Sequence, residues 1–312
     1  MRCVLIHNPA SGRNRHLRDE QLRLVVEILS ERGHFAEIWT TDGPGSAGRQ
    51  AREAAARDAE IVFACGGDGT VNEVLQGLVC EVGEPAAALG ILPFGSANAL
   101  ARHLRIALHP PTAALQQVEG ATRVVPVGKV IHGEQQRYFI VMAGAGPDGA
   151  LAAHVSGMQK SKAGRFAYYL HAGRLFLNRR FHPFEVQWKH NEGETVTTRR
   201  AVAVLAARVE CLGGLFSRLT LRHGSIADEH LQLLIVAPPA AISLPLWFLS
   251  GWLNLHRLNP LVSFENVTAF SCSHDAGGPL QAQVDGEWLG YAPIQVSVVP
   301  NALRLCVPSA RC

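Results

Sequence analysis

Residues 1–110 alternate between short apolar runs and helical patterns, and this rhythm constrains the fold more than any other feature of the chain. The expected strands are residues 2–7, 35–40, 60–65 and 87–92. The expected helices are 17–32 and 46–58, with two more that begin near Thr70 and Ala97. Strands that alternate with helices in this way favour a doubly wound α/β domain with a parallel sheet.

The pattern changes after Pro110-Pro111, where short strand-like segments follow one another with Gly, Pro, Asn and His turns between them. The expected strands are 123–130, 137–143, 183–189, 196–208, 217–222, 231–237, 261–270, 280–285 and 294–299. Helices are expected at 163–178 and 243–255. This density of strands is typical of an antiparallel sandwich or barrel, and we expect an all-β sandwich domain.

The chain length of 312 residues exceeds what one hydrophobic core usually holds, which favours two domains. We expect an α/β domain at residues 1–122 and a sandwich at 123–300, with 301–308 returning to the first domain. Apolar residues make up 47% of the chain, which excludes disorder, and a net charge of +3 is too small to indicate nucleic acid as a partner. Seven scattered cysteines without a C-x-x-C pair predict a reducing, intracellular compartment.

A glycine turn follows the expected strand 60–65 and precedes a helix; it comprises Gly66, Gly67, Asp68, Gly69 and Thr70. Ligands of open α/β sheets bind at the carboxyl ends of the strands. Glycines let backbone N–H groups approach phosphate oxygens there, and the helix N-terminus favours negative charge. Asp68 would repel phosphate, so it suits a metal-bound water or a hydroxyl proton better. The alternative is a tight turn in which Asp68 caps a helix.

Two more loops of this kind follow the first and fourth expected strands: Asn8–Gly12, and Pro93–Asn98 with Gly95 and Ser96. Each combines glycine with hydroxyl or amide groups that suit phosphate or ribose oxygens. Three such loops on one edge of a sheet favour a nucleotide site. None of these three loops carries the G-x-G-x-x-G pattern, and G-x-x-x-x-G-K-[ST] does not occur in the sequence, which argues against a dinucleotide-binding dehydrogenase and a P-loop ATPase.

Taken in order, these motifs resemble the diacylglycerol kinase catalytic superfamily of lipid kinases, which includes diacylglycerol, sphingosine and ceramide kinases. The matching segments are Asn8–Gly12, Thr40-Thr41, Gly66–Val74, Leu92–Ala101, Gly144–Gly149 and Val284–Glu287. The resemblance covers nearly the whole chain. NAD kinases and relatives of phosphofructokinase share the G-G-D-G core, so the later motifs decide between the families.

The resemblance implies a first domain like that of NAD kinase and phosphofructokinase, a second β-sandwich domain, and ATP and Mg²⁺ as cofactors. The γ-phosphoryl group of ATP would move to a lipid hydroxyl of a diacylglycerol-like, phosphatidylglycerol or sphingoid acceptor. The positions expected to bind the nucleotide are Asn8, Ser11, Gly12, Thr41, Gly66, Gly67, Asp68, Gly69, Thr70, Val71, Asn72, Glu73, Gly95, Ser96 and Asn98.

Asp285 and Glu287 are the acids expected to carry the chemistry. On a strand, their i, i+2 spacing would place both carboxylates on one face, where one could hold metal while the other acts as base. By family analogy Glu287 is the first choice for the base, with Asp285 in support and Asp68 as the other candidate. The alternative is a Val-Asp-Gly-Glu hairpin turn that exposes two solvated acids.

A structural Mg²⁺ site is a further expectation from the resemblance. Bacterial members carry an Asp-Gly-x-Leu-Asp-Val-like segment, which reads Ala-Asp-Glu-His-Leu-Gln-Leu at residues 227–233. Asp228 matches the first acid, whereas Glu229 replaces the glycine and Gln232 replaces the second acid. Backbone carbonyls near Ser225 and His230 could complete the site, and the alternative is an ordinary turn before a strand.

Two segments are candidates to meet a lipid surface. Residues 160–180 contain basic and aromatic residues but no acids, which suits a helix on anionic headgroups or one packed on the second domain. Residues 244–255 form an uncharged helix, expected to be either a buried cover or an apolar flap that admits acyl chains. We expect a cytoplasmic, peripherally membrane-associated lipid kinase. The alternatives are a soluble-substrate kinase of the NAD-kinase type and a nucleotide-binding regulator without catalysis.

Overall fold

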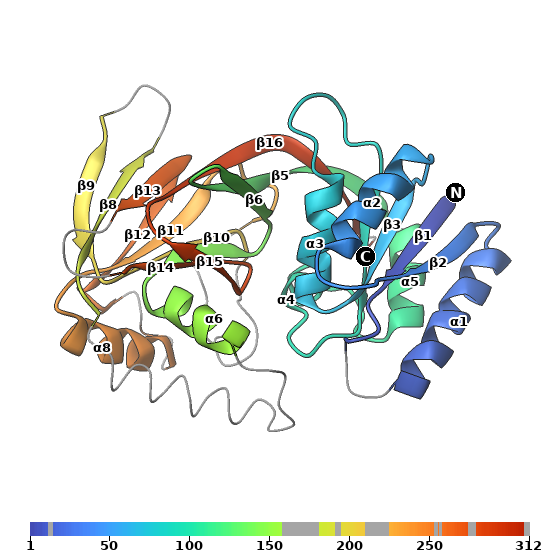
Figure 1. The fold of residues 1–312 in the computed structure, drawn as a ribbon, viewed down its shortest axis with the longest axis horizontal. Coiled ribbons are helices and arrows are strands. Elements are labelled where there is room, and N and C mark those ends of the chain that lie inside the picture. The colour runs from blue at the N-terminus through green and yellow to red at the C-terminus, as the bar shows by residue number, and fades with distance from the viewer. Residues whose placement is uncertain are drawn as a thin grey trace. The chain divides into compact units, whose positions relative to one another are not determined.

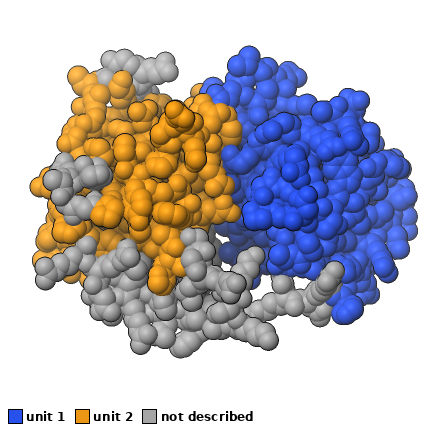
Figure 2. Space-filling view, viewed as in Figure 1, with its two compact units in different colours: residues 1–127, 299–312 blue, residues 128–298 orange. Residues whose placement is uncertain are grey.

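The computed structural model describes residues 1–11, 15–157, 181–190, 195–209, 225–252, 255, 258–273 and 279–308. The chain divides into two compact units (Figure 2). Unit 1 consists of residues 1–127 and 299–312, and unit 2 consists of residues 128–298. The chain therefore leaves unit 1 within one strand and returns to it within another.

Unit 1 is built on a parallel sheet with the strand order β2-β1-β3-β4-β16. The strands are β1 (Arg2–His7), β2 (Phe35–Thr40), β3 (Ile61–Gly66), β4 (Ala88–Pro93) and the last residues of β16 (Ile294–Val307). A further strand, β5 (Ala121–His132), pairs with β16. Every residue of β3 and β4 is buried, which requires that both faces of the sheet be covered.

Helices supply that cover (Figure 1). They are α1 (Arg15–Glu31), α2 (Ser46–Ala56), α3 (Asp68–Leu78), α4 (Ala99–His103) and α5 (Pro110–Val118). Helix α1 packs on α5, α2 packs on α3, and the two pairs lie on opposite sides of the strands. The doubly wound α/β domain that the sequence predicts is therefore confirmed.

The order of the strands creates a switch point between β1 and β3. From β1 the chain passes to β2 on one side, and it later returns to place β3 on the other side of β1. At such a point the loops after the two central strands diverge, which leaves room for a ligand at the carboxyl ends. The loop that starts at Asn8 follows β1, and the glycine turn follows β3.

Unit 2 contains two antiparallel sheets. The first has the order β12-β11-β10-β7-β14-β15. Its strands are β7 (Met142–Ala145), β10 (Ala203–Ala207), β11 (Leu231–Val236), β12 (Val262–Val267), β14 (Gln281–Val284) and β15 (Glu287–Tyr291). In the second sheet, β8 (Phe184–Lys189) pairs with β9 (Thr197–Ala201) and β13 (Ala269–Ser273), and β13 pairs with the start of β16. β6 (Gln135–Phe139) forms a hairpin with the end of β5.

Apart from Gln232, the residues of strands β10 and β11 are apolar without alternation, because both faces of these strands are buried. Val204 and Leu233 join a core that also contains residues of the second sheet, whereas Leu205 and Leu234 face a separate cluster with Leu244 of α8 (Ala240–Trp252). The two sheets therefore enclose one core, and α8 covers the outer face of the first sheet. This arrangement confirms the β-sandwich.

Some elements differ from the expectations. The strand expected at 196–208 is two strands, β9 and β10, separated at Val202. Helix α6 (Pro147–Gly157) and strand β15 were not expected, because the glycines around them indicate turns. The strand expected at 217–222 and the helix expected at 163–178 lie outside the described residues. Among the described residues, no helix combines the length and apolar character that a membrane span needs.

Candidate functional site

Asn8 connects the two loops that flank the switch point. Its backbone N–H donates to the carbonyl of Cys65 at 3.2 Å, and its side-chain amide donates to the Thr70 hydroxyl at 3.0 Å. The Asn8 amide oxygen accepts the N–H of Ala10 at 2.9 Å, which shapes the turn after β1. One side chain therefore holds the loop after β1 against the first turn of α3.

The loop after β1 is supported from α1. Ser11 Oγ lies 3.5 Å from Thr70 Oγ1, and the buried guanidinium of Arg18 donates to the Ser11 carbonyl. Arg18 places positive charge beside this loop, although it was not singled out from the sequence, because an arginine in an amphipathic helix is ordinarily solvated. Gly12, which was also expected to bind the nucleotide, lies outside the described residues.

The glycine turn (Gly66–Thr70) needs its glycines for close packing. A Cβ on Gly66 would lie 2.3 Å from Thr70 Oγ1, and a Cβ on Gly95 would lie 2.4 Å from the Cα of Gly67. The glycine turn and the loop after β4 are therefore in backbone contact. Since the first N–H groups of a helix have no intrahelical partners, the start of α3 offers donors at this edge of the sheet.

Asp68 joins the glycine turn to α4. Its carboxylate accepts the N–H groups of Asn98 at 2.9 Å and Ala99 at 2.7 Å, at the N-terminus of that helix. Burial raises the pKa of the Asp68 carboxyl, and the hydrogen bonds from Ala99 and Asn98 act in the opposite direction. Asp68 thus acts as a cap, but for α4 rather than for its own helix. Its part in catalysis stays a prediction.

The loop after β4 is closed by Asn98, whose φ of 49° is left-handed. The Asn98 side chain accepts the N–H of Gly95 at 3.1 Å and donates to the Gly95 carbonyl at 2.9 Å. Ser96 is exposed at the tip of this loop, so its hydroxyl is accessible to a ligand. The three loops that the sequence singled out are thus joined through Asn8, Thr70, Asp68 and Asn98.

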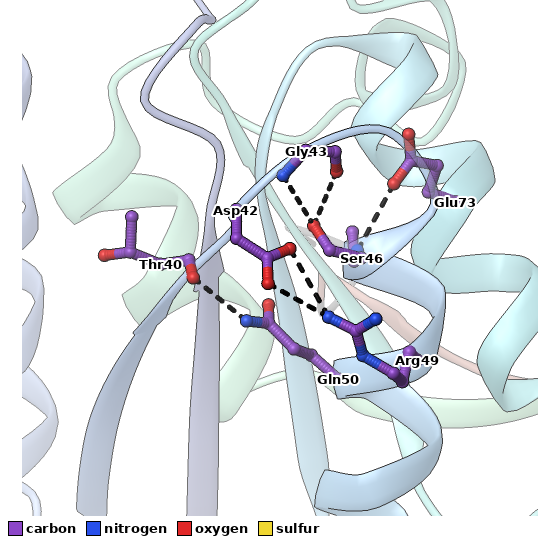
Figure 3. Close-up of polar contacts among 8 residues, drawn as sticks. Thr40, Asp42, Gly43, Ser46, Arg49, Gln50 and Glu73 are labelled. Atoms are coloured by element: carbon purple, nitrogen blue, oxygen red, sulfur yellow. Dashed lines mark hydrogen bonds and ion pairs between the residues drawn. The ribbon is translucent and has the colours of Figure 1, made fainter.

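Other residues that were expected to bind the nucleotide make contacts outside these three loops. Val71 and Asn72 are buried in α3. The Glu73 carboxylate accepts the N–H of Ala47 at 3.3 Å in the first turn of α2, where negative charge is favourable (Figure 3). Thr41 is partly exposed after β2, and its N–H donates to the carbonyl of His7 at 2.9 Å. Glu73 therefore holds α2 against α3.

Asp285 does not lie on a strand, so the expectation that Asp285 and Glu287 share a strand face is wrong. Asp285 and Gly286 form the two-residue turn between β14 and β15, with φ of 47° and 84°. Asp-Gly is a preferred sequence for such a type I′ hairpin. The Asp285 carboxylate accepts backbone N–H groups at 3.2, 3.0 and 2.9 Å; the donors are Ile140, Val141 and Met142.

Glu287 is the first residue of β15 and, like Asp285, is partly exposed. Its carboxylate Oε2 lies 2.9 Å from the Arg137 guanidinium, and the two side chains are 40% and 28% exposed. The hairpin alternative is thus right about the turn but wrong about two solvated acids, because Asp285 is bound by backbone and Glu287 is paired. With 40% of its side chain exposed, Glu287 is accessible to an outside molecule.

Asp148, in the first turn of α6, is connected to this hairpin. Gln283 donates to the Asp148 carboxylate at 3.1 Å and accepts the N–H of Gly286 at 2.8 Å. Burial raises the pKa of Asp148 from 3.8 to about 6. The Gly144–Gly149 motif marked this segment in the sequence, yet nothing in the sequence alone connects Asp148 with a glutamine 135 residues later.

The residues expected to hold a structural metal lie in the turn at 225–230. The N–H of Asp228 donates to the carbonyl of Ser225 at 3.1 Å, and the side chains of Asp228 and His230 are exposed. No group of three or more His, Cys, Asp or Glu within the described part of the chain is placed to hold a metal ion. Metal binding by Ser225, Asp228, His230 or Asp285 stays a prediction.

Comparison with known proteins places this geometry in context. Residues 2–130 match the family model described as the diacylglycerol kinase catalytic domain. A protein of Bacillus subtilis named diacylglycerol kinase is 31% identical over 239 residues, which cover 73% of this chain and 76% of the relative. One of the same name from Staphylococcus haemolyticus is 27% identical over 308 residues, covering 97% of this chain and 87% of the relative.

The fold is also similar to a solved structure. A crystal structure described as a putative diacylglycerol kinase from Bacillus anthracis str. Sterne aligns with a TM-score of 0.77 and 22% sequence identity. The alignment covers 99% of this chain and 96% of the other. The likeness therefore includes both units.

Proposed function

Because the chain belongs to the diacylglycerol kinase catalytic family, we propose that it is an ATP-dependent lipid kinase with diacylglycerol as acceptor. Its kinase character follows from the family, and the acceptor is taken from the names of the relatives. Phosphatidylglycerol and sphingoid bases also offer one hydroxyl on an apolar body, so they are the acceptors to compare.

The observation that carries this proposal is the Asn8–Thr70 hydrogen bond at the switch point. Together with the bonds of Asp68 to Asn98 and Ala99, it joins three glycine-containing loops at the carboxyl edge of one sheet. Backbone N–H groups, the Ser96 hydroxyl and the start of α3 suit a triphosphate there. We therefore assign the ATP site to these loops of unit 1.

Phosphoryl transfer needs little beyond positioning, charge neutralisation and a proton acceptor. The lipid hydroxyl oxygen would form a bond to the γ-phosphorus while the bond to the bridging oxygen breaks, leaving ADP. Glu287 would accept the hydroxyl proton, since the carboxylates of Asp68 and Asp285 already accept backbone N–H groups and Glu287 pairs with one side chain.

Mg²⁺ bound with ATP would neutralise phosphate charge, a role that a metal ion fills in phosphoryl-transfer enzymes. Asp68 is the acid within the glycine turn, and each carboxylate oxygen can accept more than one hydrogen bond. It can therefore orient a metal-bound water while it still caps α4. Asp68 could thus hold the magnesium ion through this water without help from Asp285, whose oxygens accept three backbone N–H groups.

A lipid acceptor would be reached at a membrane, so we further propose that the protein docks on a membrane surface through α8. Leu244 and Trp247 of this helix are buried, whereas Ile242, Leu246 and Leu249 are 59%, 39% and 54% exposed. The exposed residues follow the spacing of one helical face. A helix that is apolar on both sides in this way suits the boundary between protein and lipid.

The test is incubation with γ-labelled ATP, Mg²⁺ and one acceptor at a time: diacylglycerol, phosphatidylglycerol, sphingosine or soluble NAD. We expect label in the phosphorylated lipid of the diacylglycerol reaction, and much less of it with Glu287→Gln. Label in NAD and in none of the lipids would contradict a lipid kinase. Label in phosphatidylglycerol or sphingosine alone would contradict diacylglycerol as the acceptor but leave the reaction class in place.

A further inference from the structure

Arg208 is a fully buried cation outside the proposed active site. It follows β10 directly, and its side chain is among the largest in the described residues that are buried, with 1% exposed. Its guanidinium donates to the carbonyl oxygens of Ile226 at 2.8 Å and Asp228 at 3.0 Å. The backbone of the 225–230 turn is therefore folded around a positive charge.

This arrangement has the features of a cation site. Backbone carbonyls directed at a buried positive charge, beside an acidic residue, are how proteins hold a metal ion. An arginine guanidinium stays protonated in proteins, so the carbonyls of this turn face a permanent positive charge. A buried charge without such partners would cost several kcal/mol.

The donor set fits a guanidinium better than Mg²⁺. Mg²⁺ requires six oxygens in near-octahedral geometry, whereas two carbonyls of this turn already accept hydrogen bonds from Arg208. Gln232 contributes a neutral amide where a second acid would be expected, and the side chain of Glu229 is exposed. The acids of the described turn, Asp228 and Glu229, are exposed, so a divalent ion placed beside the buried Arg208 would meet a cation without a buried acid to offset it.

We infer that Arg208 takes the place of the structural metal at the 225–230 turn, which therefore binds no Mg²⁺ and is stabilised by a cation of its own chain. The backbone of Arg208 also connects the turn to the acidic hairpin. The N–H of Arg208 donates to the carbonyl of Val141 at 2.9 Å, and the N–H of Val141 donates to Asp285. The same short segment thus serves both Arg208 and Asp285.

The first experiment needs the unaltered chain and the variant Asp228→Asn, without nucleotide. Unfolding temperatures are measured in EDTA and in increasing MgCl₂ at constant ionic strength. We expect Mg²⁺ to change the unfolding temperatures of the unaltered chain and of Asp228→Asn in the same way. A rise of equal size in both proteins would place Mg²⁺ elsewhere and support the inference. A saturable rise in the unaltered chain that is lost in Asp228→Asn would overturn it.

The second experiment tests the guanidinium itself. Arg208→Met should lower the unfolding temperature by about 5 °C or more, because it leaves the inward carbonyls without a donor. Arg208→Lys keeps the positive charge but lacks the planar guanidinium. Its unfolding temperature should therefore lie between those of the unaltered chain and Arg208→Met. The matched control is Arg200→Met on β9, whose side chain is exposed. If Arg208→Met does not fold, Arg208→Lys decides alone, and an unchanged unfolding temperature in it would overturn the inference.

Discussion

The Asn8 amide lies 3.0 Å from the hydroxyl of Thr70, although the two residues are 62 positions apart in the chain. The bond spans the switch point between β1 and β3, where the strand order requires adjacent loops to diverge. It fixes the distance between the two loops before any ligand arrives. A phosphate bound there would meet donors that are already in position, which lowers the entropic cost of binding.

Removal of the Thr70 hydroxyl should weaken ATP binding without unfolding unit 1. Thr70→Val keeps the side-chain shape but leaves the Asn8 amide without its acceptor, and we expect the Kd for ATP to rise about tenfold. Thr70→Ser keeps the hydroxyl and is the matched control. Titration calorimetry with ATP measures both variants. Equal affinities for the Val and Ser variants would contradict a positioning role for the Asn8–Thr70 bond.

Substitutions of Asp285 and Glu287 should differ in how much they lower the stability of unit 2. Asp285→Asn places an amide among three N–H donors, so we expect unit 2 to lose about 2 kcal/mol or more of unfolding free energy. Glu287→Gln removes one partly exposed ion pair and should cost less than about 1 kcal/mol. Denaturant unfolding followed by tryptophan fluorescence compares the two variants. A larger loss for Glu287→Gln would reverse the roles assigned here.

Asp148 should make stability depend on pH. Its folded-state pKa of about 6 lies above the ordinary value of 3.8, so the folded state holds the proton more tightly. The stability contribution is complete below pH 3.8 and is lost as the pH rises through 6; at most it amounts to about 3 kcal/mol. The unfolding temperature of Asp148→Asn, relative to the unaltered chain, should therefore increase by several degrees between pH 4.5 and pH 7.5. Asp42→Asn, an exposed acid, is the control and should show no such trend.

The exposed face of α8 should control membrane binding. The double variant Leu246→Ser with Leu249→Ser removes apolar surface that a bilayer would cover, and we expect its partition to lipid vesicles to fall roughly tenfold. Leu24→Ser, at an exposed leucine of α1, is the control. Co-sedimentation with phosphatidylcholine–phosphatidylglycerol vesicles measures both. Equal partition of the double variant and the control would contradict docking through α8.

Local patterns in the sequence were sufficient to predict most of the fold. Strands 60–65 and 87–92 are buried on both faces, which gives continuous apolar runs, and α1 shows its buried face at helical spacing. Helix α6 was missed because Gly144–Gly149 indicates a turn, and the helix begins only within that motif. Strand β15 was missed because Gly286 before it and Gly290 within it indicate turns.

The site was predictable as a set of loops but not as a set of contacts. Glycine and hydroxyl residues after three strands indicate which loops meet, because parallel strands end on one edge. Which atoms meet depends on tertiary packing: Asp68 caps α4 rather than α3, and Glu73 reaches Ala47 of α2. The same holds for Asp285, whose expected strand position is overridden by the Asp-Gly turn.

The central claim is that the loops after β1, β3 and β4 bind ATP and that Glu287 accepts the proton of a lipid hydroxyl. Its most direct test is single-turnover transfer of the γ-phosphoryl group to diacylglycerol at saturating ATP and Mg²⁺. For Glu287→Gln, we expect ATP affinity within about twofold of the unaltered chain and a transfer rate at least about a hundredfold lower. A Glu287→Gln protein that transfers phosphate at the unaltered rate would contradict this account.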